Sequence, residues 1–225
     1  MTTSPAPISR SLFFFSIFYG GMVCIAGVLG NKQVALGPLS GIGPIVGLGP
    51  LAVEAGIFAF LLLVTISSAV AELHGRAVAT RLVQIGFLPL IASILLSILV
   101  LAAPAAGDMD PARADAFALM MGGTPRIWLG GIIAYGISQT LNVTLFAALK
   151  GREGSRLLWL RAATASILSQ IVDTLLFVTI AFYGIFPIGE LLLGQMLAKV
   201  LLSAILVPPV IYLLVGLGRR LDRQS

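Results

Sequence analysis

Five polar side chains in an apolar stretch of the sequence have the spacing of one helix face: Ser166, Ser169, Gln170, Asp173 and Thr174. Intervals of three and four residues place all of them on the same side of an α-helix. Asp173 falls near the middle of the stretch, and at the centre of a bilayer an ionised side chain costs roughly 2.5 to 3.5 kcal/mol. The carboxylate therefore needs a charged partner, a polar cavity or a bound proton.

The preceding apolar stretch repeats this arrangement, with Tyr135, Ser138, Gln139 and Asn142 on one helix face. The segment SQTLNVTLF, which begins at Ser138, also resembles SQIVDTLLF, which begins at Ser169. On helices that run in opposite directions, this match would form a small inverted repeat, a feature that places transporter sites near the membrane midplane. Two polar faces are therefore predicted to meet inside the protein.

A third stretch carries Gln195, Lys199 and Ser203 on one face. At 1.5 Å of rise per residue, Lys199 and Asp173 reach a similar depth of about 15 Å from the external ends of successive helices, so they could form an ion pair. Such a pair either lines a substrate or ion pathway or holds two helices together for about 1 kcal/mol. The additional Gln and Ser neighbours exceed what one pair needs and favour the pathway.

Other ionisable residues lie near predicted helix ends. We expect Glu54 and Glu72 to reach interfacial water, and Arg126 and Arg161 to anchor helix starts at the interface, although these four could also guard an entrance. His74 has no second metal ligand near it, and no spacing assembles a nucleophile, a base and a carboxylate. The sequence therefore predicts no enzyme activity, no metal site and no cofactor.

The elements that must position these residues follow from composition. Of 225 residues, 58% are hydrophobic and 10% are charged, against roughly a quarter charged in a soluble domain. Apolar stretches of about 20 residues, enough to cross a bilayer, recur along the chain. We predict an all-α polytopic membrane protein, a single transmembrane domain over residues 1–225, with six helices at 11–31, 52–71, 81–103, 126–149, 158–183 and 189–216.

The basic residues predict the orientation of this domain. If both termini are cytoplasmic, three basic residues lie outside, namely Lys32, Arg113 and Arg126, and ten lie inside. That bias agrees with the positive-inside rule. The ten are Arg10, Arg76, Arg81, Lys150, Arg152, Arg156, Arg161, Arg219, Arg220 and Arg223. The net charge of +5 therefore indicates membrane topology and not nucleic-acid binding.

Two external connections stand out. The segment GPLSGIGPIVGLGP, from Gly37, is rich in residues that break helices, so we expect irregular backbone there. It would be a compact loop or a gate over a substrate cavity. The segment DMDPARAD, from Asp108, is acidic and predicted to be a solvated loop.

The segment RAATASILSQIVDTLLFVTIAF, from Arg161, resembles the signature helix of the queuosine precursor transporter family, also known as vitamin uptake transporters. The resemblance extends over most of the chain, through Asn31-Lys32, Glu72-x-x-Gly75-Arg76, Pro125-Arg126-Ile127, Lys199-Val200 and Pro208. The chain departs from the family pattern at Ser68 and Asn142, where that pattern leads us to expect Asp. Both departures remove a negative charge and put the exact ligand in doubt.

The resemblance implies uptake of a 7-deazapurine, such as 7-cyano-7-deazaguanine, across the bacterial inner membrane by facilitated or ion-coupled transport. Asp173 would accept the ring N–H groups, and Gln139, Gln170 or Lys199 would contact a ring carbonyl. Tyr135 or a phenylalanine from the first helix would stack on the ring. The predicted substrate-binding set is Asp173, Gln170, Ser169, Gln139, Asn142, Tyr135 and Lys199.

Two other functions remain open at this stage. Small six-helix vitamin binders work with a separate energising ATPase module, and this chain has their length. A membrane-embedded scaffold or lipid-modifying enzyme would use the polar faces as contacts between helices, and Asp173→Asn would then lower stability without affecting solute uptake. The expected partners are a small-molecule substrate and membrane lipid; a homo-oligomer or separate energising subunits both remain open.

Overall fold

The computed structural model describes residues 9–45, 47, 49–123, 125–150, 157–184 and 188–223, without the side chains at 125, 126, 190 and 191. Six helical segments in these ranges are long and apolar enough to cross a membrane, which confirms the prediction. They are α1 (Arg10–Leu29), α3 (Gly56–His74), α4 with α5 (Arg76–Ile85 and Phe87–Ala102), α7 (Pro125–Ala148), α8 (Leu158–Phe182) and α9 (Gly189–Arg223).

The third segment begins five residues earlier than the predicted residue 81 and is interrupted at Gly86. A side chain at Gly86 would collide with the Tyr135 hydroxyl and the Tyr19 ring, so the close approach of these tyrosines requires glycine. Gly75, which separates α3 from α4, has a φ of 88° that other residues rarely adopt. These two glycines set the bounds of α4.

The connection after α1 is more ordered than predicted. Strands β1 (Gln33–Ala35) and β2 (Ala52–Glu54) pair antiparallel, with Gln33 opposite Glu54, so the second predicted helix starts at Gly56 instead of residue 52. The described part of the segment between the strands includes a 3-10 helix, η1 (Gly37–Gly41), and a short helix, α2 (Ile42–Ile45). This hairpin departs from the all-α prediction; its two strands flank the glycine- and proline-rich segment, and their pairing satisfies backbone hydrogen-bonding groups on both sides of it.

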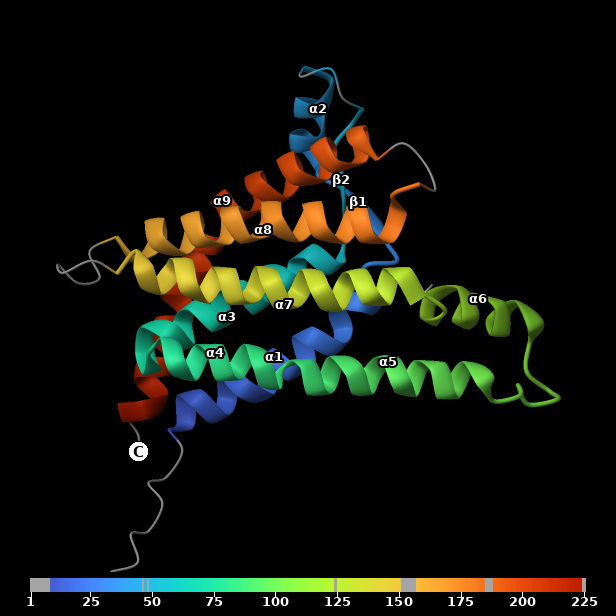
Figure 1. Cartoon of the computed structure of the whole chain (residues 1–225), viewed down its shortest axis with the longest axis horizontal. Coiled ribbons are helices and arrows are strands. Elements are labelled where there is room, and N and C mark those ends of the chain that lie inside the picture. The colour runs from blue at the N-terminus through green and yellow to red at the C-terminus, as the bar shows by residue number, and fades with distance from the viewer. Residues whose placement is uncertain are drawn as a thin grey trace, which may run out of the picture.

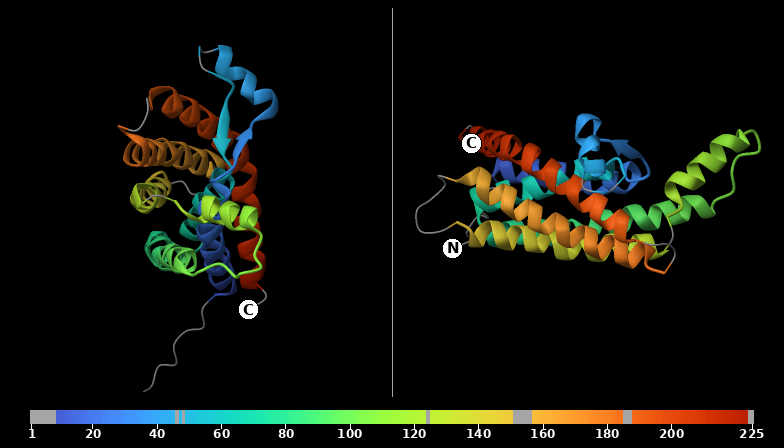
Figure 2. Two further views of the ribbon diagram at one scale, coloured as in Figure 1. Left: turned by 90° about the vertical axis from the view of Figure 1, so that its right-hand side faces the viewer. Right: turned by 90° about the horizontal axis from the view of Figure 1, so that it is seen from above.

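The acidic connection also differs from the prediction of a plain loop. It contains α6 (Pro111–Met121), whose first turn is capped by Asp110, since the Asp110 carboxylate accepts a hydrogen bond from the Ala112 N–H at 3.0 Å. An acidic cap followed by proline is a common helix start. Figure 2 shows α6 projecting beyond the bundle.

The helices pack with α8 between α7 and α9, and with α3 against α1, α7 and α9 (Figure 1). Helix α5 contributes no fully buried residue, and it exposes leucines such as Leu95 and Leu99, as a helix facing lipid does. The start of α1 and the end of α9 meet, because the Ser11 N–H donates to Asp222 Oδ1 at 2.9 Å. We call this the terminal end of the bundle, and the opposite end, which carries β1, β2 and α6, the hairpin end.

Candidate functional site

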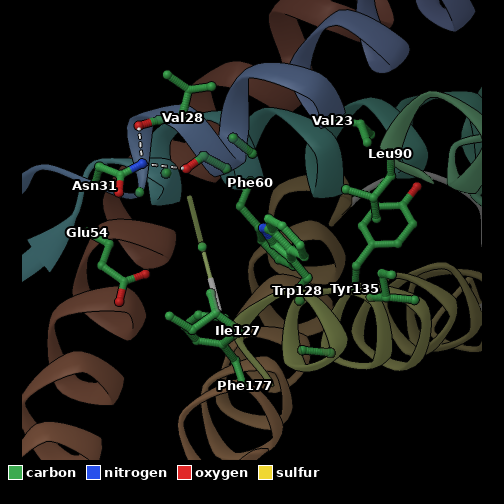
Figure 3. Close-up of a pocket in the computed structure, with 18 of the residues that line it drawn as sticks. Val23, Val28, Asn31, Glu54, Phe60, Leu90, Ile127, Trp128, Tyr135 and Phe177 are labelled. Carbon is green, nitrogen blue, oxygen red and sulfur yellow. Dashed lines mark hydrogen bonds between the residues drawn. The ribbon is translucent and has the colours of Figure 1, made fainter. Parts of the chain in front are cut away.

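A cavity of about 480 Å³ lies toward the hairpin end, and its walls come from α1, the β1–β2 hairpin, α3, α5, α6, α7, α8 and α9. The walls are mainly apolar and aromatic. Figure 3 shows Trp128 and Phe60 in the middle of the view, with Glu54 on one side and Tyr135 on the other. Sites for small molecules have volumes of roughly 300 to 1,000 Å³ and combine apolar walls with a few polar groups. The cavity has the size and lining of such a site.

Asp173 of α8 is the most fully bonded charged group on this cavity. Lys199 Nζ, from α9, lies 3.5 Å from Asp173 Oδ2, and Ser138 Oγ, from α7, donates to Asp173 Oδ1 at 3.1 Å. The ion pair that the helix depths predicted is therefore confirmed. The polar face of α8 is buried as a whole, because it packs between the two neighbouring helices.

Glu54 brings a second carboxylate to the same cavity. It ends β2, and Gln195 Nε2 of α9 donates to its Oε1 at 3.3 Å. Burial raises the pKa of Glu54 above its ordinary value, and nearby Lys199 and Gln195 offset part of this increase. Glu54 was expected to reach interfacial water at a helix end; it lies instead at the end of a strand, where it contacts α9 and is only partly buried.

Tyr135 anchors the aromatic part of the wall. Its hydroxyl lies 3.0 Å from the Tyr19 hydroxyl and donates to the Val83 carbonyl at 3.1 Å, while its ring meets Phe87 edge-on at 5.0 Å. Trp128 was not among the predicted site residues, although it precedes Tyr135 by seven residues and therefore shares its helix face. Following the same helix face for two more turns toward the start of α7 would have identified Trp128.

The remaining predicted binding residues lie outside the cavity lining. Asn142 Nδ2 donates to Val64 O and Ser67 Oγ, both at 3.0 Å, and to Ser68 Oγ at 3.1 Å, while Ser67 Oγ donates to Gln139 at 3.4 Å. These groups form a buried cluster between α3 and α7. The cluster includes both positions at which the chain departs from the family pattern, Ser68 and Asn142, so the two missing carboxylates would have been neighbours.

Ser169 and Gln170 are also buried away from the cavity. Ser169 Oγ donates to the Ser166 carbonyl at 2.9 Å. Both polar atoms of the Gln170 amide have no hydrogen-bond partner in the described part of the chain. Of the seven predicted binding residues, the structure therefore brings Asp173, Lys199 and Tyr135 to the cavity and places Gln139, Asn142, Ser169 and Gln170 deeper in the bundle.

Two residues predicted to face the interface are buried at the terminal end. Arg161 Nη1 lies 3.2 Å from Glu72 Oε2, and Lys150 Nζ lies 3.6 Å from the same oxygen. The Arg161 guanidinium also covers the Phe146 ring at 4.3 Å and donates to the Phe146 carbonyl at 3.2 Å. Glu72 and Arg161 lie near helix ends, as expected, but their side chains are buried against each other instead of reaching water, because opposite charges on adjacent helices can be buried together. The side chain of Arg126 lies outside the described part.

A second polar network closes the terminal end. Ser11 Oγ lies 2.7 Å from His74 Nε2 and donates to Asp222 Oδ2 at 2.7 Å, which joins α1, α3 and α9. Within the described ranges, no three His, Cys, Asp or Glu side chains lie close enough to hold a metal ion. His74 thus takes part in a contact between helices.

Comparison with known proteins adds to this geometry. Residues 54–214 match the family described as "Putative vitamin uptake transporter". A relative from Bacillus subtilis (strain 168), described as "Probable queuosine precursor transporter", is 33% identical over 142 residues, which cover 61% of this chain and 61% of that protein. The match therefore spans about three fifths of the relative. No solved structure matches the chain. The family match over residues 54–214 contains Glu54, Trp128, Tyr135, Asp173 and Lys199.

Proposed function

The chain belongs to the putative vitamin uptake transporter family, and from this premise we propose that it imports a queuosine precursor, a 7-deazapurine such as 7-cyano-7-deazaguanine. It is a multi-pass membrane transporter. The description of the Bacillus relative supports the substrate class, and we place the protein in the bacterial inner membrane on the same basis.

The observation that carries the proposal is the set of groups around Asp173. A deazaguanine ring presents adjacent N–H donors on one edge, which the Asp173 carboxylate can accept. The ring carbonyl next to these donors can accept from the Lys199 ammonium, which lies 3.5 Å from Asp173. The aromatic side chains of Trp128 and Tyr135 supply flat surfaces for the ring, and stacking on such surfaces contributes about 1–3 kcal/mol per base.

Charge distribution supports the direction of transport. The basic side chains of the last turn of α9, Arg220 and Arg223, lie at the terminal end, as do Arg10 and Arg76 at the starts of α1 and α4. By the positive-inside rule this end faces the cytoplasm. The cavity toward the hairpin end then lies on the outer side of the protein, where an importer collects its substrate.

The test is rescue of queuosine in tRNA in a bacterium that lacks both deazapurine synthesis and its own importer. Limiting 7-cyano-7-deazaguanine is supplied, and cells express the wild type, Asp173→Asn or the matched control Asp115→Asn, whose carboxylate is exposed on α6. We expect queuosine with the wild type and the control, and at least tenfold less with Asp173→Asn at equal membrane insertion. An inserted wild type that restores no queuosine would refute the deazapurine assignment.

A further inference from the structure

The charged groups on the cavity do not balance. In the described lining, the acidic and basic side chains are Glu54, Asp173 and Lys199, two carboxyl groups and one amine. A neutral base such as 7-cyano-7-deazaguanine cannot compensate for the extra negative charge. Partial burial of a carboxylate without a charged partner is unfavourable and favours binding of a proton or a cation.

The contacts indicate which carboxylate is uncompensated. Lys199 is paired with Asp173, and Ser138 donates to the other oxygen of that carboxylate. The hydrogen-bond partner of Glu54 is the neutral amide of Gln195. The excess negative charge therefore falls on Glu54.

Gln195 has the chemistry to accompany a change of protonation at Glu54. Its side chain is almost fully buried, 3% exposed, and its Nε2 donates to Glu54 while its Oε1 has no hydrogen-bond partner in the described structure. An amide offers donors on one side and an acceptor on the other. After rotation about its terminal bond, the same side chain accepts a hydrogen bond from a protonated Glu54, so Gln195 can serve both states.

We propose that Glu54 is a proton-binding site and that its proton accompanies the substrate during import. The coupling of this proton to substrate import rests on the proposed function, whereas proton binding at Glu54 does not depend on it. One proton binds Glu54 from the outer side and is released inside with the neutral base, so one positive charge enters per substrate. Gln195 is a positioning residue that adjusts its hydrogen bond to the protonation state.

The groups around Glu54 are compatible with this role. Lys199 of α9 and Asp173 of α8 are the charged groups that act on it, with opposite signs. From β1 it faces the neutral Gln33, its cross-strand partner, and the side chain of Lys32, one residue before β1, is exposed. Burial raises the pKa of Glu54, which favours the protonated form at pH values where an exposed glutamate is ionised.

The proton site can be tested without any substrate. Infrared difference spectra between acidic and alkaline pH are recorded on the purified chain in lipid, for the wild type, Glu54→Gln and Asp115→Asn. We expect a carbonyl band of a protonated carboxyl group that persists at higher pH than that of an ordinary glutamate. It should be absent in Glu54→Gln and present in Asp115→Asn. An unchanged band in a folded Glu54→Gln, with the same thermal unfolding profile as the wild type, would overturn the proposal.

Coupling is tested in liposomes with the membrane potential clamped. An acid-outside gradient of one pH unit should support up to about tenfold accumulation of labelled 7-cyano-7-deazaguanine if one proton moves with each base. Counterflow exchange, which needs no gradient, is measured in parallel. In Glu54→Gln, the ratio of gradient-driven accumulation to counterflow should fall at least fivefold, and in Glu54→Asp it should recover in part.

The two assays separate the failures. Wild-type counterflow without any response to the pH gradient would overturn proton coupling and leave the substrate assignment intact. Absence of counterflow would refute the deazapurine as substrate, and the infrared result would still decide whether Glu54 binds the proton.

Discussion

The two ends of the bundle use buried charges in opposite ways. At the terminal end, Glu72 contacts two cations, Arg161 and Lys150, and the Ser11–His74–Asp222 contacts join three helices. At the hairpin end, Lys199 pairs with Asp173, Glu54 contacts the neutral Gln195, and all three charged residues line a cavity of about 480 Å³. A carboxylate that contacts cations on neighbouring helices stabilises a closed end, whereas a carboxylate without a cationic partner beside a cavity is available to a ligand.

The comparison indicates what transport requires. Under the proposed function, substrate enters at the hairpin end and leaves at the terminal end, so the contacts of Arg161 and Ser11 must separate in another conformation. Between the two ends, the Ser67, Ser68, Gln139 and Asn142 cluster lies across the route. The unpartnered amide of Gln170 lies at this depth too, on the buried face of α8. The following predictions test this division of roles, beginning with the largest effect.

Arg161→Met should destabilise the protein strongly. The substitution leaves the buried Glu72 carboxylate with Lys150 as its remaining cationic partner, and the Lys150 side chain is 49% exposed. Removing one partner of a buried ion pair costs about 3–5 kcal/mol. Thermal unfolding in detergent measures the loss, with Arg81→Met, an exposed residue of α4, as the control. Adding Glu72→Gln to Arg161→Met should recover part of the stability. If neither Arg161→Met nor the double variant changed the unfolding temperature, the buried ion pair would not stabilise the terminal end.

Trp128→Leu should weaken substrate binding by about tenfold, because stacking on an aromatic side chain contributes about 1–3 kcal/mol per base. The chain has two tryptophans, and the other, Trp159, is exposed near the terminal end of α8. It therefore provides a matched control, Trp159→Leu. Equilibrium binding of 7-cyano-7-deazaguanine decides the matter, and equal affinities of the two variants would show that the base does not stack on Trp128.

Asn142→Ala should lower stability without changing affinity. It removes the donor to Val64 O, Ser67 and Ser68, and the lost hydrogen bonds to buried groups cost about 1–3 kcal/mol. Unfolding and equilibrium binding are measured on the same preparation. A large loss of affinity with normal stability would move the substrate site deeper into the bundle, toward the residues that the sequence favoured.

The smallest expected effect is a pH dependence of stability that originates at Glu54. Its folded-state pKa is raised above the ordinary 4.5, so the folded protein holds this proton more tightly than the unfolded chain. The stability gained from this tighter proton binding is complete at pH values below the pKa of Glu54 in the unfolded chain. It is lost as the pH rises through the pKa of Glu54 in the folded protein. The difference in unfolding temperature between the wild type and Glu54→Gln should therefore change over that window, and a difference independent of pH would contradict the shift.

Much of this architecture was predictable because it depends on local pattern. Apolar run length indicated all six membrane-spanning segments. The spacing of Ser166 through Thr174 indicated a polar face, and helix rise placed Lys199 and Asp173 at one depth, where they pair. The hairpin was not predicted because the apolar pattern around it carries no signal for a three-residue strand. Helix α6 was not predicted because an aspartate followed by a proline, which begins this helix, is also common in loops.

The sequence by itself determined which residues lie on which helix face, since that depends on the 3.6-residue period alone. Only the tertiary structure decided what each part of a face contacts. Ser138 and Asn142 are one turn apart on α7, yet Ser138 binds Asp173 beside the cavity and Asn142 binds α3 in the sealed interior. The physical reason is that a cavity is the space left between helices that are distant in the sequence. Contacts between such helices, such as the close approach of Tyr19 and Tyr135 around Gly86, cannot be predicted from the periodicity of any single helix.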